Sequence, residues 1–198
     1  MDTRCKLLQA ASEIVLQDGT NGLTLDAVAK RAQVSKGGLL YHFASKEALV
    51  EGLIDILVRG FEEALAAHEA VEPPGPGRLT RAYLRAKADM VERSNSCAEM
   101  SGLLAAVANR PELLCRFRER MASCRLRLAD DGIDPATAAI VQLAADGLTM
   151  THLLDLHPPT AELRGEIVAR LVELTHAADG AHAARPLLPT ARRTTKSS

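Results

Sequence analysis

The chain has 198 residues, of which 47% are hydrophobic and 25% are charged, and its formal net charge at pH 7 is -1. This apolar content is enough for one large or two small cores without disulfides or metals, which excludes a predominantly disordered chain. The near-zero net charge excludes a protein that coats nucleic acid through a broad basic field.

The charges are unevenly divided along the chain. Residues 1–48 hold six Lys or Arg against five Asp or Glu, whereas residues 49–179 hold fourteen against twenty. Residues 180–198 hold four basic residues and no acidic one. If residues 1–48 bind DNA, the affinity must therefore come from a few well-placed phosphate contacts and from dimerisation.

The start of the chain is unlike a signal peptide, because charged residues interrupt its apolar positions from Asp2 to Glu13. No apolar run reaches the roughly eighteen residues that a membrane-spanning helix needs. We therefore expect a cytoplasmic protein that makes no contact with a membrane.

The cysteines form no CxxC pair and no Cys/His cluster with the spacing of metal ligands. We expect reduced, mostly buried thiols and neither a zinc site nor a disulfide framework. These cysteines are Cys5, Cys97, Cys115 and Cys124.

The spacing of apolar residues predicts helices along almost the whole chain, and no segment shows a convincing β-alternation. Residues 18–22 and 71–78 are rich in helix breakers, so we expect a turn and a loop there. The sequence thus predicts an all-α fold of about nine helices. The expected helices are residues 3–17, 24–32, 35–42, 45–69, 79–94, 97–109, 111–129, 135–156 and 160–178.

Hydroxyl side chains predict where three of these helices begin. Thr24, Ser35 and Ser45 each stand where a side-chain oxygen can accept a free backbone N–H of the first helical turn. Two short helices joined by a tight turn, the second opened by a capping Ser, are typical of a helix-turn-helix, here from Thr24 to His42. Its expected core positions are Leu25, Val28, Ala29, Ala32, Val34, Leu39 and Phe43.

Gly37 and Gly38 are costly inside a helix unless another surface must approach closely. DNA in the major groove is one such surface. The alternative is that the two glycines only loosen a short surface turn, and local spacing does not decide between these interpretations.

Four segments in this region, in order and with the expected spacing, resemble the tetracycline-repressor (TetR) family. The resemblance covers roughly residues 3–50, and the rest of the chain matches in length and helicity. The segments are Thr24-Leu25-Asp26-Ala27-Val28-Ala29, Val34-Ser35-Lys36-Gly37, Tyr41-His42-Phe43 and Ser45-Lys46-Glu47-Ala48-Leu49.

The resemblance implies a transcriptional regulator with a helix-turn-helix domain at residues 1–48 and a helical effector-binding and dimerisation domain at 49–179. Residues 180–198 are dominated by Ala, Arg, Pro, Thr, Lys and Ser with little to bury, so we expect a disordered tail there. The resemblance assigns Thr24 and Lys46 to the DNA backbone. It places Ser35, Lys36, Gly37 and Gly38 at the groove-facing start of the recognition helix, with Tyr41 and His42 on flanking phosphates. A half-buried core position is the alternative for Tyr41.

Two residues depart from the family pattern. Gln33 stands where Gly is usual, so a positive φ at this turn would cost more strain here. Leu40 replaces the customary aromatic residue and offers an apolar surface to a thymine methyl group. The operator sequence of another family member therefore does not transfer to this chain.

A cavity for an apolar small-molecule effector is implied by the resemblance, and helical stripes rich in methionine are suited to line it. Taken singly, each of these residues is equally at home in an ordinary core. The candidate pocket residues are Tyr83, Met90, Met100, Leu104, Phe117, Met121 and Cys124.

The last two helices carry apolar faces that similar regulators pair with a second copy as a four-helix bundle. A two-fold dimer places its recognition helices about 34 Å apart, so we expect a palindromic operator and a repressor that an effector releases. The candidate interface residues are Ile140, Leu143, Gly147, Thr151, Leu154, Leu163, Ile167, Leu171 and Leu174.

No constellation of residues indicates an enzyme, and we expect no cofactor. His152, Asp155 and His157 are the nearest to a metal site, but a solvated helix end explains them better. For Cys124, neither a basic partner nor a resolving Cys is evident at close sequence spacing, so a small core residue explains it better than a redox sensor. The remaining alternative is a helical adaptor protein without specific DNA binding.

Overall fold

The computed structural model describes residues 2–92 and 111–177, and of residues 20, 111–117, 120 and 177 the backbone alone. The described residues form eight α-helices and no strand, in agreement with the all-α prediction. The helices are α1 Thr3–Gly22, α2 Leu25–Ala32, α3 Lys36–His42, α4 Lys46–Val71, α5 Arg78–Glu92, α7 Pro111–Ala129, α8 Pro135–Leu153 and α9 Ala161–Ala177.

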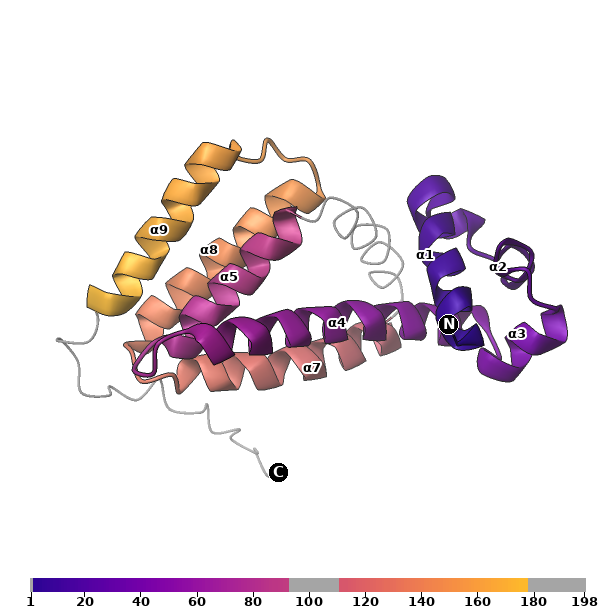
Figure 1. The fold of residues 1–198 in the computed structure, drawn as a ribbon, viewed down its shortest axis with the longest axis horizontal. Helices are drawn as coiled ribbons and strands as arrows, with labels where there is room; N and C mark the ends of the chain where they lie inside the picture. Colours follow the sequence, from indigo (N-terminus) through magenta and orange to yellow (C-terminus); the bar gives the residue numbers. More distant parts are fainter. Residues whose placement is uncertain (1, 93–110, 178–198) are drawn as a thin grey trace, which may run out of the picture.

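The molecule is elongated, with α4 running between its two ends (Figure 1). The helices α1, α2 and α3 gather around the start of α4, and we call this part, up to Leu53, the N-terminal unit. The rest of α4 packs on α5 and α7, which form the other end together with α8 and α9; we call this end the helical body.

All three predicted helix caps are confirmed. The side-chain oxygens of Thr24, Ser35 and Ser45 accept hydrogen bonds from backbone N–H groups three residues later, at 3.1, 3.1 and 3.2 Å. Each bond satisfies an N–H that the first helical turn leaves without a backbone partner. The short helices α2 and α3 therefore begin at defined residues.

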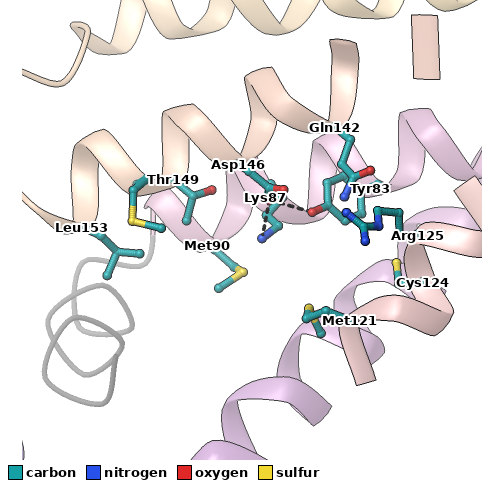
Figure 2. A pocket seen from close by; sticks show the side chains of 11 residues that line it. Tyr83, Lys87, Met90, Met121, Cys124, Arg125, Gln142, Asp146, Thr149 and Leu153 are labelled. Carbon is teal, nitrogen blue, oxygen red and sulfur yellow. Dashed lines mark hydrogen bonds and ion pairs between the residues drawn. The ribbon is translucent and has the colours of Figure 1, made fainter. Parts of the chain in front are cut away.

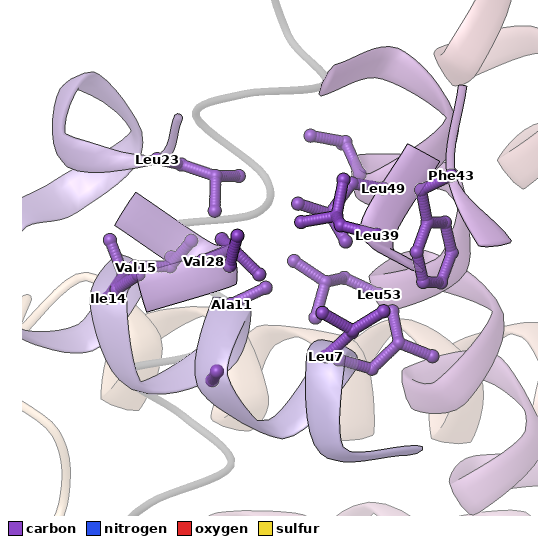
Figure 3. Close-up of a cluster of buried hydrophobic side chains, with 14 residues drawn as sticks. Leu7, Ala11, Ile14, Val15, Leu23, Val28, Leu39, Phe43, Leu49 and Leu53 are labelled. Carbon is purple, nitrogen blue, oxygen red and sulfur yellow. The ribbon is translucent and has the colours of Figure 1, made fainter. Parts of the chain in front are cut away.

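The core of the N-terminal unit is a single cluster of aliphatic side chains closed by Phe43 (Figure 3). Leu7 and Ala11 of α1, Val28 of α2 and Leu39 of α3 are fully buried in it. Leu49 and Leu53 of α4 belong to the same cluster, so the N-terminal unit is packed directly onto the helix that leads to the body.

Close packing of α4 against the N-terminal unit depends on Gly52. A Cβ at this position would lie 2.9 Å from both Leu8 Cδ2 and Phe43 Cε1. Both neighbours are buried, so neither has free space into which it can move.

The body is built around α5, which contacts α4, α7, α8 and α9. Its first turn is held by Asp131, whose carboxylate accepts hydrogen bonds from the backbone N–H groups of Leu79 and Thr80. The buried cluster around α5 consists of Phe61, Leu65, Leu79, Ala82, Tyr83, Leu84, Ala86, Leu128, Val141, Ala145 and Leu171.

A buried ion pair joins the end of α4 to α5. Arg81, which is 3% exposed, donates from Nε to Glu72 Oε2 at 3.2 Å and from Nη1 to the backbone oxygen of Pro76 at 3.0 Å. Arg85 donates to the other oxygen of Glu72. Burial raises the pKa of Glu72, but the hydrogen bonds and charges of Arg85 and Arg81 outweigh burial and hold that pKa below its ordinary value.

Several boundaries and exposures differ from the sequence predictions. α1 extends to Gly22, with a break at Gly19 where φ is 67°, instead of ending near residue 17. α8 ends at Leu153, three residues early, because Asp155 takes a positive φ of 50° and turns the chain. Cys5 is exposed and Cys124 half-buried, so these two thiols are not the buried groups that we expected.

Some predictions fall outside the described residues. These are the helix at 97–109 and the tail at 180–198. Within residues 2–92 and 111–177, no helix has the length and apolar character needed to cross a bilayer.

Replacing Gly52 with Ala should lower the free energy of unfolding by about 1–3 kcal/mol, because the added methyl group overpacks the contact with Leu8 and Phe43. Gly60 is the matched control on the same helix, since a Cβ there meets nothing within 4 Å. Gly60→Ala should stabilise by about 0.5–1 kcal/mol. Urea unfolding measures both values, and equal effects of the two substitutions would contradict this view of the contact.

Replacing Glu72 with Gln should destabilise the protein by about 3 kcal/mol at neutral pH, because Arg81 keeps a buried charge without its partner. Glu69→Gln, which breaks a more exposed pair with Arg127, should cost less than about 1 kcal/mol. Since the pKa of Glu72 is lowered by folding, its stabilising contribution is complete at neutral pH and is lost as the pH falls below about 4.5. Chemical unfolding at several pH values should show the wild type and Glu72→Gln converging in acid.

Candidate functional site

The helix α3 is anchored by one face and presents the other to solvent. Leu39 is fully buried and Phe43, directly after the helix, is also buried. Lys36, Gly37 and Leu40 are exposed, and they lie on one face because their spacing follows the helical repeat. An outward face with one cation, a glycine and an apolar side chain is suited to approach another molecule closely.

Tyr41 extends this face, because its side chain is 87% exposed. Its ring packs edge-on against the ring of His42, with centroids 5.1 Å apart. The structure therefore contradicts a half-buried core position for Tyr41 and leaves its hydroxyl accessible as a donor. Thr24 is exposed, whereas His42 and Lys46 are half-buried.

The two glycines of α3 differ in their surroundings. A Cβ at Gly38 would lie 2.9 Å from Val34 Cγ1. Glycine at this position therefore lets α3 pack against Val34 in the turn between α2 and α3. A Cβ at Gly37 would meet nothing within 4 Å. The protein itself thus gives a reason for Gly38 but none for Gly37, which leaves Gly37 available for close approach by a partner.

The turn between α2 and α3 is closed by Gln33 in the left-handed conformation, with φ 56° and ψ 42°. Its backbone N–H caps the end of α2 by donating to the carbonyl oxygens of Ala29 and Lys30. A side chain in this region costs strain that glycine avoids, as the sequence analysis expected for a positive φ at this residue. The helix-turn-helix geometry is therefore kept despite Gln33.

Lys36 forms an ion pair with Asp26 across this turn, with Nζ 2.9 Å from Oδ1. Both side chains are more than half exposed, so the pair contributes little to stability. It orders the Lys36 ammonium beside the N-terminal turn of α2.

The body contains a cavity of about 270 Å³ between α5, α7 and α8 (Figure 2). The candidate pocket residues Tyr83, Met90, Met121 and Cys124 line it. Met100, Leu104 and the side chain of Phe117 lie outside the described residues. The remaining lining residues are Lys87, Arg125, Gln142, Asp146, Thr149, Met150 and Leu153.

The polar lining residues were missed by the sequence analysis, which followed apolar stripes only. Lys87 lies one helical turn after Tyr83, so extending the stripe to its i+4 neighbour would have found it. Asp146 and Arg125 lie on other helices, and no local signal in the sequence connects them with Tyr83.

These side chains form a network across the cavity wall. The Tyr83 hydroxyl donates to Asp146 Oδ1 at 2.6 Å, and Lys87 Nζ lies 2.9 Å from the same oxygen (Figure 2). Burial, followed by the negative charge of Asp146, raises the pKa of Tyr83 far above its ordinary value, so its hydroxyl stays protonated and donates.

Lys87 also reaches α4. Its Nζ lies 4.9 Å from the centre of the Phe61 ring and 5.4 Å from that of Tyr83, both within the range of cation–π contacts. One side chain of the cavity wall thus contacts the helix that carries the N-terminal unit.

Cys124 contributes a neutral surface to the cavity. Burial raises the pKa of its thiol, an effect that nearby Arg127 and Lys87 only partly offset. A thiol with a raised pKa is a poor nucleophile, which argues against the redox-sensor alternative.

The outer face of α8 is an apolar stripe with a regular helical spacing. Ile140, Leu143 and Leu154 are exposed, with Gly147 between them. Met150, which the sequence analysis did not include, is also exposed and fills the gap in this stripe. The opposite face of α8, with Ala138, Val141, Ala145 and Thr149, is buried against the body.

The candidate interface residues of α9 are divided between two faces. Leu163 and Leu174 are exposed, and Ile167 is half-buried against the core. Leu171 is 7% exposed and belongs to the core cluster of the body. Its expected place at an outer interface is therefore corrected, because the face of α9 that packs on the body includes Leu171.

Thr151 of α8 is half-buried and donates to the Leu148 carbonyl oxygen.

No cluster of three or more His, Cys, Asp or Glu side chains with the geometry of a metal site occurs in the described part of the chain. His152 is the last basic residue of α8, whereas Asp155 and His157 lie in the following turn with positive φ.

A capped helix-turn-helix on a helical body with a cavity between its helices defines a class of protein, the helix-turn-helix transcriptional regulators. Residues 7–53 match the family described as "Bacterial regulatory proteins, tetR family", and residues 77–176 match "Tetracyclin repressor-like, C-terminal domain". The chain belongs to the TetR family of transcriptional regulators, which is a family of regulators and not of enzymes.

Curated relatives match only part of this chain. The transcriptional regulator UidR of Escherichia coli K12 is 39% identical over 64 residues, which are 32% of this chain and 31% of UidR. The regulator BetI of Burkholderia thailandensis is 31% identical over 86 residues, or 43% of this chain and 44% of BetI. These matches thus span less than half of either relative.

Solved structures resemble the whole fold. A TetR-family member from Streptomyces coelicolor is 27% identical with a TM-score of 0.68, and the match covers 86% of this chain and 98% of that one. The multidrug binding protein EbrR, complexed with malachite green, is 29% identical with a TM-score of 0.69 over 86% of this chain and 98% of EbrR.

Proposed function

We propose that this protein is a homodimeric repressor that binds a palindromic operator and is released from it by a small-molecule effector. The observation that carries the proposal is the outer face of α3, where Lys36, Gly37, Leu40 and Tyr41 are exposed around the buried anchor Leu39. A helix held in this way can enter the major groove without disturbing the core of its unit.

Each residue of the proposed DNA-binding surface has a distinct role. Backbone N–H groups at the start of α3, opened by Ser35, attract phosphate, and the exposed Thr24 and half-buried Lys46 contact the backbone beside them. Lys36, Gly37 and Leu40 face the groove, where Leu40 can meet a thymine methyl group, and Gly38 contributes backbone to the same start of α3. Tyr41 and His42 donate to flanking phosphates.

Dimerisation compensates for the near-neutral charge of the N-terminal unit. The exposed stripe on α8 is apolar over several turns, and covering it with a second copy removes it from water. Leu163 and Leu174 of α9, with Ile167 at the edge, complete the proposed interface. Two copies then present two α3 helices to one face of the DNA.

Control by an effector is supported by the position of the cavity. A ligand between α5, α7 and α8 would contact Lys87, which touches Phe61 of α4 and Asp146 of α8. Because α4 carries the N-terminal unit and α8 carries the proposed interface, a ligand that favours another packing of these helices changes the spacing of the two units. EbrR, described as a multidrug binding protein, supports a small-molecule role for this cavity.

The proposal divides the chain into residues 1–48 for DNA binding, 49–179 for effector binding and dimerisation, and a tail at 180–198. It places the protein in the cytoplasm, where DNA and metabolites are both accessible. The adaptor alternative differs in one measurable property, because an adaptor does not discriminate between DNA sequences.

Selection from random duplex DNA by the full-length protein should yield a palindromic sequence, with binding that weakens steeply as salt is added. Lys36→Ala should reduce affinity for this sequence about tenfold, and Tyr41→Phe should reduce it several-fold through the loss of one hydrogen bond. Arg59→Ala is the control, because it also removes one positive charge but lies about 20 Å along α4 from Lys46. It should leave the affinity for DNA unchanged. No enrichment at low salt would favour the adaptor alternative.

Replacing Leu143, 71% exposed on α8, with Glu should weaken the dimer at least about 100-fold, because each copy would bury a carboxylate in the interface. Leu126→Glu is the matched control, since Leu126 is 73% exposed but lies on α7. Light scattering at micromolar concentration should give a monomer mass for the first variant and a dimer mass for the second. A dimer mass for both variants would contradict an interface that includes Leu143 of α8.

A further inference from the structure

The charges that line the body cavity indicate which class of effector it takes, an inference that rests on the effector-responsive function proposed above. We propose that the cavity binds a small amphipathic anion, namely a carboxylic acid with an apolar body, whose carboxylate lies between Arg125 and Lys87.

The described lining of the cavity carries a surplus of positive charge. Lys87 and Arg125 are cationic, and Asp146 is the only acidic side chain among the described lining residues. The Asp146 carboxylate is already neutralised, since its Oδ1 accepts from the Tyr83 hydroxyl and lies 2.9 Å from Lys87 Nζ. Arg125, an exposed residue, is therefore the charged group of the described lining that no partner among the described residues neutralises.

Arg125 stands on the α7 wall, opposite the network of Tyr83 and Asp146. Its side chain extends from α7 toward Tyr83 and Gln142 in the close view of the cavity (Figure 2). Among the residues that the structure describes, Arg125 has no ion pair or hydrogen bond. A planar guanidinium with all its donors available is the group best suited to bind a carboxylate in a bidentate manner.

The other walls suit the apolar part of such a ligand. Met90, Met121 and Leu153 supply flexible apolar surface, and the thiol of Cys124 is kept neutral by its raised pKa. The volume of about 270 Å³ lies just below the usual range for ligand pockets, which starts at about 300 Å³. A short acyl chain or a single aromatic ring fits this volume better than a polycyclic compound.

An organic cation is disfavoured by the same geometry. To reach the Asp146 carboxylate it must displace Lys87 Nζ, and it then lies near two like charges. A neutral ligand gains the apolar contacts but leaves the donors of Arg125 without an anionic acceptor. The anion alone uses both the apolar wall and the unpaired cation.

Calorimetric titration of the full-length protein with octanoate, octan-1-ol and octylammonium at neutral pH tests the proposal, because these probes share one chain and differ in charge. Octanoate should bind at least about tenfold more tightly than octan-1-ol, and octylammonium most weakly. Arg125→Gln should weaken octanoate binding about tenfold and leave octan-1-ol unchanged. Arg127→Gln, on the same helix but paired with Glu69 outside this cavity, should change neither.

Several results would overturn the ligand class. These are octan-1-ol binding as tightly as octanoate, octylammonium binding best, no binding of octanoate at millimolar concentration, or equal effects of the two Arg substitutions. The proposed function fails separately, because operator affinity is measured in its own experiment. If octanoate binds in the expected pattern but does not weaken operator binding, the ligand class stands and the effector-controlled release of DNA is wrong.

Discussion

The constraint on which the structure depends is that one helix, α4, belongs to two hydrophobic cores. Leu49 and Leu53 complete the cluster of the N-terminal unit, and Phe61 and Leu65 belong to the cluster of the body. Because helices are stiff over this length, the direction of α4 in the body fixes the position of the N-terminal unit. Any repacking of the body around α4 therefore moves the whole N-terminal unit, including the proposed DNA-binding surface on α3.

The charge distribution explains why position matters so much in this protein. The N-terminal unit is nearly neutral, and its Lys36 is engaged by Asp26 when DNA is absent. Such a unit has little nonspecific attraction for DNA, so in the dimer proposed above we expect useful affinity to come from two copies at a spacing that matches the groove repeat. Small changes in the spacing then have a large effect on binding, which suits a regulator that responds to a ligand through α4.

The sequence predicted those features that arise from residues close together in the chain. The caps at Thr24, Ser35 and Ser45 were predictable because a hydroxyl acts on an N–H three residues later. The network of Lys87, Asp146 and Tyr83 was not, because it depends on how α5 packs against α8. Leu171 was assigned to the wrong face of α9 for the same reason, since periodicity identifies an apolar stripe but not the helix that covers it.

The central claim is that two N-terminal units, each carried by its α4, contact one operator together. Cys5 is exposed on α1 and provides a natural labelling site once Cys97, Cys115 and Cys124 have been replaced by Ala. Pulsed electron resonance of the spin-labelled protein should give one distance between the two copies, and binding of the selected operator should narrow its distribution. Absence of dipolar coupling in the operator-saturated protein would mean that single copies bind independently, which would contradict the claim.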